Sequence, residues 1–267
     1  MRSLVEAHIR QMHNAAPLAR RPGWSVGWET RVARKFPERS FAAFLFDMDG
    51  TILDSIAVAN RVWTAWAERH GLDAAKVIEV MHGVQVAATV RRFASPEMDV
   101  EREAAWITAA EVADVDGIVE VAGAGAFLER LPQDRWAVVT SAPRELAVRR
   151  IEAAGLPTPP ILISAEDVPN GKPAPDCFVI AAHALGVDPA DCLVWEDAPA
   201  GIAAGEAAGA TVIVVEATHK DSRNGGRFRV SDYQGLVARL TSSGKLRLIE
   251  EQGLGRPSDH VSHVPGQ

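Results

Sequence analysis

The stretch that most constrains the fold is residues 44–55, where an apolar run ends in two carboxylates separated by one residue. Residues 42–46 are short, apolar and rich in aromatic side chains, a pattern typical of a central parallel strand covered on both faces. Gly50 follows and allows the backbone to turn sharply out of the sheet. Because open α/β sheets bind ligands at the C-terminal ends of their strands, we expect Asp47 and Asp49 to border a site there.

Two carboxylates on one face of a strand end repel each other unless a cation, a shared proton or a bend separates them. A hard divalent ion such as Mg²⁺ solves this problem, and it commonly holds substrate phosphate as well. A calcium loop that begins Asp-x-Asp is excluded, because its glycine is sixth and its glutamate twelfth, whereas Gly50 is fourth and Val58 twelfth. The other alternative is a solvated turn with two acids. The strand-then-turn context favours a catalytic strand end.

Three further segments place polar residues at strand ends or in a loop. They are Ala-Val-Val-Thr-Ser at 137–141, Asn-Gly-Lys-Pro-Ala-Pro-Asp at 170–176, and Leu-Val-Trp-Glu-Asp-Ala-Pro-Ala-Gly at 193–201. Together with Asp-Met-Asp-Gly-Thr at 47–51, these segments resemble, in order, the four motifs of the haloacid dehalogenase-like (HAD) superfamily. The resemblance covers about residues 42–216 and is close to bacterial sugar-phosphate and glycerol-phosphate phosphatases.

The resemblance implies a Mg²⁺-dependent phosphatase that hydrolyses a small phosphorylated metabolite, such as a sugar or polyol monophosphate. By motif position, Asp47 is the nucleophile that forms an aspartyl-phosphate. Asp49 protonates the leaving alkoxide and then activates the hydrolytic water. Thr140 donates its hydroxyl to the transferring phosphoryl group, and Lys172 neutralises phosphate charge and holds the nucleophile.

The metal site implied by the resemblance lies between the first and last motifs. Asp197 binds Mg²⁺ together with the Asp47 carboxylate and the Asp49 backbone carbonyl. Glu196 is either a direct ligand or a partner that orients a metal-bound water. Two adjacent acids at the end of an apolar strand are costly to bury without a cation. Ser141, through its hydroxyl or its amide, and Gly50 are the expected phosphate-binding residues.

Between the first two motifs the pattern becomes helical. Helices are expected over 74–81, 84–93 and 100–112, after a first helix that ends at Gly71. Its apolar stripe recurs at three- and four-residue steps and consists of Val58, Val62, Trp63, Trp66 and His70. The spacing favours core packing for the tryptophans over ligand stacking. The block resembles the small helical cap of one HAD subgroup, which would close over the site, exclude water and select the substrate.

The cap loop at residues 82–85 is the expected source of specificity. In related caps an equivalent glycine-containing loop faces the catalytic aspartates. His82, Gln85 and Arg91 are therefore candidates to hydrogen-bond the hydroxyls of a polyol. The alternative is that His82 caps a helix and Arg91 is a solvated charge.

After the cap, strands and helices alternate, which predicts right-handed crossovers and a parallel sheet. Strands are expected at 136–140, 160–164, 192–196 and 211–215, and helices at 123–131, 144–154, 176–185 and 202–208. The fold class is therefore α/β, with a Rossmann-like parallel sheet core (41–56 and 121–240) and an inserted all-helical cap domain (57–120). Residues 1–40 are expected to form a poorly ordered extension, and residues 241–267 a C-terminal tail.

Composition narrows the classes of partner. A net charge of −7 argues against a nucleic-acid-binding surface. No apolar run approaches the ~20 residues of a membrane helix. Two cysteines, Cys177 and Cys192, are too few for a disulfide framework and indicate buried thiols in a reducing compartment, so we expect a cytoplasmic protein. The expected partner is a phosphorylated small molecule, and the expected assembly is a monomer or a weak homodimer.

Several rival activities are tested by the same residues. A haloacid dehalogenase needs no general acid two residues after the nucleophile, and phosphonate-cleaving relatives place a small residue there, so Asp49 argues against both. A β-phosphoglucomutase-like phosphomutase shares all four motifs and stays an alternative. Its cap loop carries a basic residue for a second phosphate, whereas Val86 follows Gln85 here, which favours hydrolysis. A non-catalytic binding or regulatory module is expected to lack one of Asp47, Asp49, Lys172 and Asp197, and all four are present.

Overall fold

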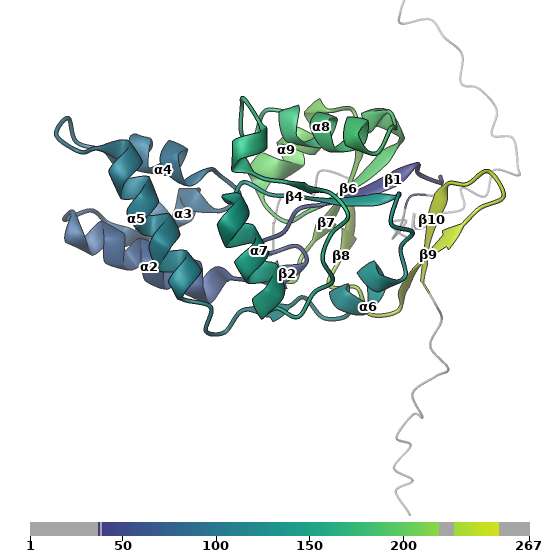
Figure 1. The fold of residues 1–267 in the computed structure, drawn as a ribbon, viewed down its shortest axis with the longest axis horizontal. Helices are drawn as coiled ribbons and strands as arrows, with labels where there is room; N and C mark the ends of the chain where they lie inside the picture. Colours follow the sequence, from purple (N-terminus) through teal and green to yellow (C-terminus); the bar gives the residue numbers. More distant parts are fainter. Residues whose placement is uncertain (1–36, 38, 219–226, 251–267) are drawn as a thin grey trace, which may run out of the picture. The chain divides into compact units, whose positions relative to one another are not determined.

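A six-stranded parallel sheet forms the centre of the protein (Figure 1). The structure is a computed structural model, and it describes residues 37, 39–218 and 227–250 of the 267. The strand order is β5-β4-β1-β6-β7-β8, and each pairing is parallel. The strands are β1 (Ala43–Phe46), β4 (Trp136–Val139), β5 (Leu162–Ile163), β6 (Cys192–Glu196), β7 (Thr211–Val215) and β8 (Phe228–Val230). The predicted α/β class is confirmed.

Both faces of this sheet are covered, which explains the unbroken apolar run of β1. Phe44 and Phe46 enter one buried layer, which includes Phe127 of α6 (Ala124–Glu129) and residues of α7 (Arg144–Ala153). Ala43 and Leu45 enter the opposite layer, against α8 (Asp176–Ala184) and α9 (Pro199–Ala207). Figure 1 shows these two helix layers on either side of the strands. Alternation of side chains along a strand delivers both layers from a single four-residue segment.

The C-terminal boundary differs from the expectation. An antiparallel hairpin of β9 (Leu236–Leu240) and β10 (Leu246–Glu250) follows the sheet. Phe41 and Leu246 exchange backbone hydrogen bonds of 2.7 Å in both directions, and Leu248 is also buried. The tail expected from residue 241 is therefore corrected, because residues 241–250 are bound to the core. The extension and tail predictions for residues 1–36 and 251–267 lie outside the described residues.

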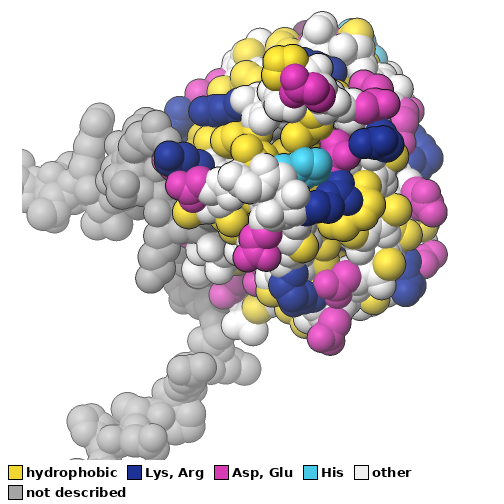
Figure 2. Space-filling model, turned by 90° about the vertical axis from the view of Figure 1, so that its left-hand side faces the viewer, with side chains coloured by type: hydrophobic (Ala, Val, Ile, Leu, Met, Phe, Trp, Pro, Cys, Tyr) yellow, Lys and Arg dark blue, Asp and Glu magenta, His cyan; other side chains and the backbone are white. Residues whose placement is uncertain are grey.

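Four helices form the cap: α2 (Ile56–Arg69), α3 (Ala74–Met81), α4 (Val86–Phe93) and α5 (Val100–Ala113). Their shared core buries Trp63 and Trp66, which are 3% and 0% exposed. The tryptophans therefore pack as the helical spacing predicts, although Trp63 also reaches a pocket described below. Figure 2 shows acidic and basic side chains interspersed with apolar ones on the face it presents.

Two short strands connect the cap to the core. β2 (Leu53–Asp54) pairs antiparallel with β3 (Val119–Glu120), so the outgoing and returning segments of the chain lie side by side. β2 lies just before the helical segment and β3 just after it, and these two strands were not expected. Within the described ranges, the structure contains no helix long and apolar enough to span a membrane.

Candidate active site

The neighbouring strands β4, β1 and β6 bring their C-terminal residues to one edge of the sheet. Asp47 follows β1, Thr140 follows β4, and Asp197 follows β6, and each is at most 5% exposed. Lys172, from the loop before α8, is 4% exposed and reaches the same edge. The predicted convergence of the four motif segments is therefore present in the structure.

Lys172 links two carboxylates at the centre of this edge. Its Nζ donates to Asp47 Oδ1 at 2.5 Å and to Glu196 Oε1 at 2.8 Å. A third contact, at 3.3 Å, goes to the backbone oxygen of Val139. An ammonium group has three N–H donors, so these acceptors account for all of them.

Burial and like charges dominate the electrostatics of the cluster. Burial, together with the negative charge of Glu196, raises the pKa of Asp47 to about 7. Burial also raises the pKa of Glu196. It acts to lower the pKa of Lys172, but the carboxylates of Asp47 and Glu196 outweigh it and raise that pKa. With Asp197 included, three carboxyl groups lie near the single ammonium group of Lys172, so a further positive charge would be stabilised in this buried site.

The acidic cluster fits a divalent ion. Asp47, Glu196 and Asp197 each offer an oxygen, and these oxygens lie within 4.8 Å of one another. However, Glu196 Oε2 accepts the backbone N–H groups of Asp197 and Ala198 at 2.8 Å, while Oε1 accepts from Lys172. Both oxygens of Glu196 are thus engaged with the protein, which favours an indirect role. The carboxylates of Asp47 and Asp197 form a donor set suited to Mg²⁺.

Gly50 brings the first and last motifs into close contact. Its φ is +83°, and a Cβ atom at this position would lie 2.0 Å from Asp197 Oδ2. Its amide donates to Leu53 O at 2.7 Å, inside the turn. Its amide hydrogen is therefore engaged inside the turn, and the assignment of Gly50 as a phosphate-binding residue stays a prediction. Glycine is required here for space and for backbone conformation.

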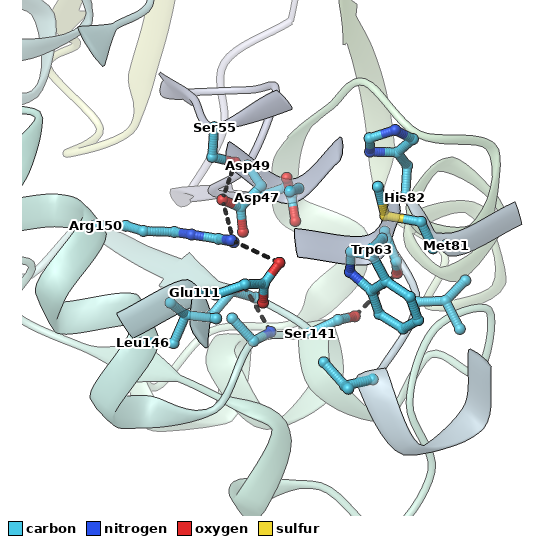
Figure 3. A pocket seen from close by; sticks show the side chains of 16 residues that line it. Asp47, Asp49, Ser55, Trp63, Met81, His82, Glu111, Ser141, Leu146 and Arg150 are labelled. Carbon is cyan, nitrogen blue, oxygen red and sulfur yellow. Dashed lines mark hydrogen bonds and ion pairs between the residues drawn. The ribbon is translucent and has the colours of Figure 1, made fainter. Parts of the chain in front are cut away.

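Asp49 is held by two donors that the sequence analysis did not identify. Its Oδ1 accepts from Ser55 Oγ at 2.6 Å and from Arg150 Nη1 at 2.9 Å. Arg150 comes from α7 and also pairs with Glu111 of α5, across the cap–core boundary. Figure 3 shows Asp47 and Asp49 facing the same pocket, with the Arg150 guanidinium next to Asp49.

The two hydroxyls after β4 have different partners. Thr140 Oγ1 accepts the backbone N–H of Ala142 at 3.0 Å, which leaves its own hydrogen to donate to a phosphate oxygen. Ser141 Oγ donates to the backbone oxygen of Gly83 in the cap loop at 3.0 Å. Ser141 therefore anchors the cap loop through its hydroxyl, and the expectation that Ser141 binds phosphate, through its hydroxyl or its amide, stays a prediction.

The candidate cap residues do not all reach the pocket. His82 lines it beside Met81 (Figure 3). Gln85 instead donates from Nε2 to the backbone oxygen of Ala165 at 3.3 Å, which attaches the loop to the core. The side chain of Arg91 is 64% exposed, its nearest acid is Glu101 at 4.0 Å, and it does not line the pocket. The expectation that Arg91 contacts substrate is therefore corrected in favour of the solvated alternative.

Arg150 and Glu111, which were not predicted, are each a charged residue on the buried face of a helix. Arg150 shares a buried helix face with Leu146, Ala147 and Ile151. Glu111 lies eight positions after Glu103 and four after Ile107 on the buried face of α5. A charged residue within an apolar stripe is expensive to bury unless it is paired, so such positions are candidates for a functional partner.

A family model described as haloacid dehalogenase-like hydrolase matches residues 41–209. The chain belongs to this family, which confirms the resemblance drawn from the four motifs.

Among individual proteins, hexitol phosphatase A of Escherichia coli (strain K12) is 42% identical over 178 residues, covering 65% of this chain and 82% of that one. Glycerol-1-phosphate phosphohydrolase 2 of Saccharomyces cerevisiae is 35% identical over 190 residues, covering 66% and 75%. A solved structure of a hydrolase from Pseudomonas syringae has a TM-score of 0.64 and 25% identity, covering 71% and 92%.

Proposed function

We propose that this protein is a Mg²⁺-dependent phosphatase that hydrolyses a sugar or polyol monophosphate through an aspartyl-phosphate on Asp47. The observation that carries the proposal is the buried cluster of Asp47, Lys172 and Asp197 beside Asp49 at the sheet edge. The phosphatase names of the two curated relatives support the same reaction class.

The reaction divides into two displacements at phosphorus. Asp47 forms a bond to phosphorus as the bond to the substrate alcohol breaks, and Asp49 gives its proton to the departing oxygen. Asp49 then takes a proton from water, which attacks phosphorus, releases inorganic phosphate and restores Asp47. Lys172 and the Thr140 hydroxyl stabilise the charge that develops on the phosphoryl oxygens. When held by Asp47 and Asp197, Mg²⁺ supplies further positive charge and favours the ionised form of Asp47.

The pocket supports hydrolysis of a monophosphate rather than a mutase reaction. A bisphosphate intermediate requires positive charge for its second phosphate. Among the described residues that line the pocket there is no lysine, and the arginine, Arg150, is paired with Asp49 and Glu111. Val86, which stands where the mutase loop has its basic residue, lines the pocket with an apolar side chain.

The protein as proposed needs no partner beyond its phosphorylated substrate and acts as a monomer or weak homodimer. We propose a cytoplasmic location, and the buried free thiols of Cys177 and Cys192 support it, since such thiols are common in a reducing compartment.

Phosphate release from glycerol, hexitol and hexose monophosphates, with Mg²⁺ and with EDTA, tests the proposal. We expect metal-dependent release that falls by at least about 10³-fold in Asp47→Asn. Asp73→Asn is the matched control, since Asp73 caps α3 and asparagine caps a helix equally well. β-Glucose 1-phosphate is followed in parallel for glucose 6-phosphate. Isomerisation without phosphate release would assign a mutase, and no turnover on any substrate would favour a non-catalytic module.

A further inference from the structure

Arg150 joins the core to the cap next to Asp49. Its Nη1 donates to Asp49 Oδ1 at 2.9 Å, and its Nη2 lies 3.1 Å from Glu111 Oε1. The side chains of Arg150 and Glu111 are only 5% and 4% exposed. Figure 3 shows the guanidinium between the two carboxylates. A chain of charges thus runs from the expected acid of the core to a helix of the cap.

This arrangement is expensive for a purely structural contact. Helices α5 and α7 pack directly on each other, and both helices carry buried apolar residues near the pair in sequence: Ile107 four positions before Glu111, and Ile151 next to Arg150. Apolar side chains at positions 111 and 150 would pack there without the cost of desolvating an ion pair. Burial raises the pKa of Glu111, and Arg150 opposes that shift. Because packing alone does not require the charges of Arg150 and Glu111, we expect their role to lie in the active site.

The contacts act on the orientation of Asp49. In the described part of the chain, the hydrogen bonds to this carboxylate, from Ser55 and Arg150, both go to Oδ1. Two donors on one oxygen fix the side chain and leave Oδ2 for the substrate. Ser55 and Arg150 lie in the core, whereas Glu111 belongs to the cap, so the position of the guanidinium depends on the docking of α5.

We propose that Arg150 is a positioning residue that, clamped by Glu111 of the docked cap, orients Asp49 to protonate the leaving group. The inference rests on the proposed phosphatase reaction and deepens it, because it links cap docking to proton transfer. Arg150 could instead contact the hydroxyls of the substrate directly, or it could stabilise the fold alone. Each of these two roles predicts a different dependence of kcat/KM on the substrate.

Three substrates separate these roles. Glycerol 3-phosphate has hydroxyls and a poor leaving group, ethyl phosphate has a poor leaving group without hydroxyls, and p-nitrophenyl phosphate has a leaving group that departs without a proton. The quantity measured is kcat/KM with Mg²⁺, which covers the steps up to leaving-group departure and omits hydrolysis of the phosphoenzyme. The variants are Arg150→Met, Arg150→Lys and Glu111→Gln, each checked for cooperative thermal unfolding.

We expect Arg150→Met to lower kcat/KM by about 100-fold on both alkyl phosphates and by less than about 5-fold on p-nitrophenyl phosphate. We expect Glu111→Gln also to lower kcat/KM more on the alkyl phosphates than on p-nitrophenyl phosphate, but by a smaller factor than Arg150→Met. If Arg150→Met does not fold, Arg150→Lys carries the test with the same pattern, since a lysine cannot span both carboxylates as a planar fork does. Arg61→Met is the control for the loss of an arginine–carboxylate pair away from the pocket, because Arg61 contacts Asp114 at 3.0 and 2.8 Å with its side chain 48% exposed.

An equal loss on all three substrates would show a structural role and overturn the inference. A loss confined to glycerol 3-phosphate would show direct hydroxyl recognition and overturn it as well, as would no loss at all. Failure of wild type on every substrate would be a different result, since it would remove the proposed phosphatase function itself.

Discussion

Gly201 lies so close to Glu196 that no side chain fits between them. A Cβ atom at position 201 would lie 1.4 Å from Glu196 Oε1, the atom that accepts from Lys172. Gly201 belongs to the first turn of α9, so the helix start and the acid are packed against each other. The position of Lys172 therefore depends on Gly201, because any larger side chain at position 201 would displace its partner Glu196.

Gly201→Ala is expected to displace Glu196 and, through it, Lys172. We predict a loss of about 2 kcal/mol in the free energy of unfolding and a loss of at least about 10-fold in kcat, since misplaced catalytic groups are costly. Urea unfolding and phosphate release measure the two effects. Gly205→Ala is the matched control, because its added methyl group would press on Val212 and Val194 and leave Glu196 in place. Similar loss of kcat in both variants would contradict the prediction.

At the scale of elements, helix α5 presents acids to both the cap core and the pocket. Glu111 faces Arg150, and Glu103, two turns earlier, is 3% exposed within the cap. Glu103 Oε2 accepts from Trp66 Nε1 at 3.1 Å, lies 2.9 Å from His70 Nε2, and pairs with Arg69. These contacts tie α5 to α2 and thereby fix the helix that carries Glu111.

Replacing Glu103 tests this coupling. Glu103→Leu leaves the Trp66 N–H without its acceptor, and we expect a loss of about 2 kcal/mol in the free energy of unfolding. Glu101→Leu, on the same helix with a side chain 83% exposed, should change it by less than about 0.5 kcal/mol. Chemical denaturation measures both variants. A Glu103→Leu protein as stable as wild type would mean that this cluster does not hold α5.

The sequence predicted elements with long, regular patterns and missed short ones. The helix at 74–81 and the strands at 192–196 and 211–215 were predicted with the observed bounds. The two-residue strands β2 and β3 are too short to show any period. β10 is as long as the strands at 192–196 and 211–215, but it is partly exposed and charged residues interrupt its apolar run, whereas those two strands are buried almost throughout.

The residues of the candidate site also differ in whether the sequence could predict them. Asp47, Lys172 and Asp197 stand in local motifs, so their convergence followed from the parallel topology alone. Arg150 and Glu111 meet only because α5 docks on α7, and no local pattern specifies that packing.

At the scale of the whole described molecule, core and cap build one site from opposite sides. The core supplies the carboxylates and Lys172 at the strand ends, and the cap supplies the opposite wall of the pocket. Side-chain contacts from Ser141 to Gly83, from Gln85 to Ala165 and from Arg150 to Glu111 hold the two together. The paired strands β2 and β3 make the covalent connection between them.

The central claim is that this assembly forms a covalent phosphoenzyme, and chemical trapping tests it most directly. Protein turning over p-nitrophenyl phosphate with Mg²⁺ is quenched in acid and reduced with borohydride, which converts an aspartyl-phosphate into homoserine. Peptide mass spectrometry then locates the changed residue. We predict homoserine at position 47, and none in Asp47→Asn. Homoserine at another position, or phosphate release with no trapped residue, would contradict the assignment of Asp47 as the nucleophile.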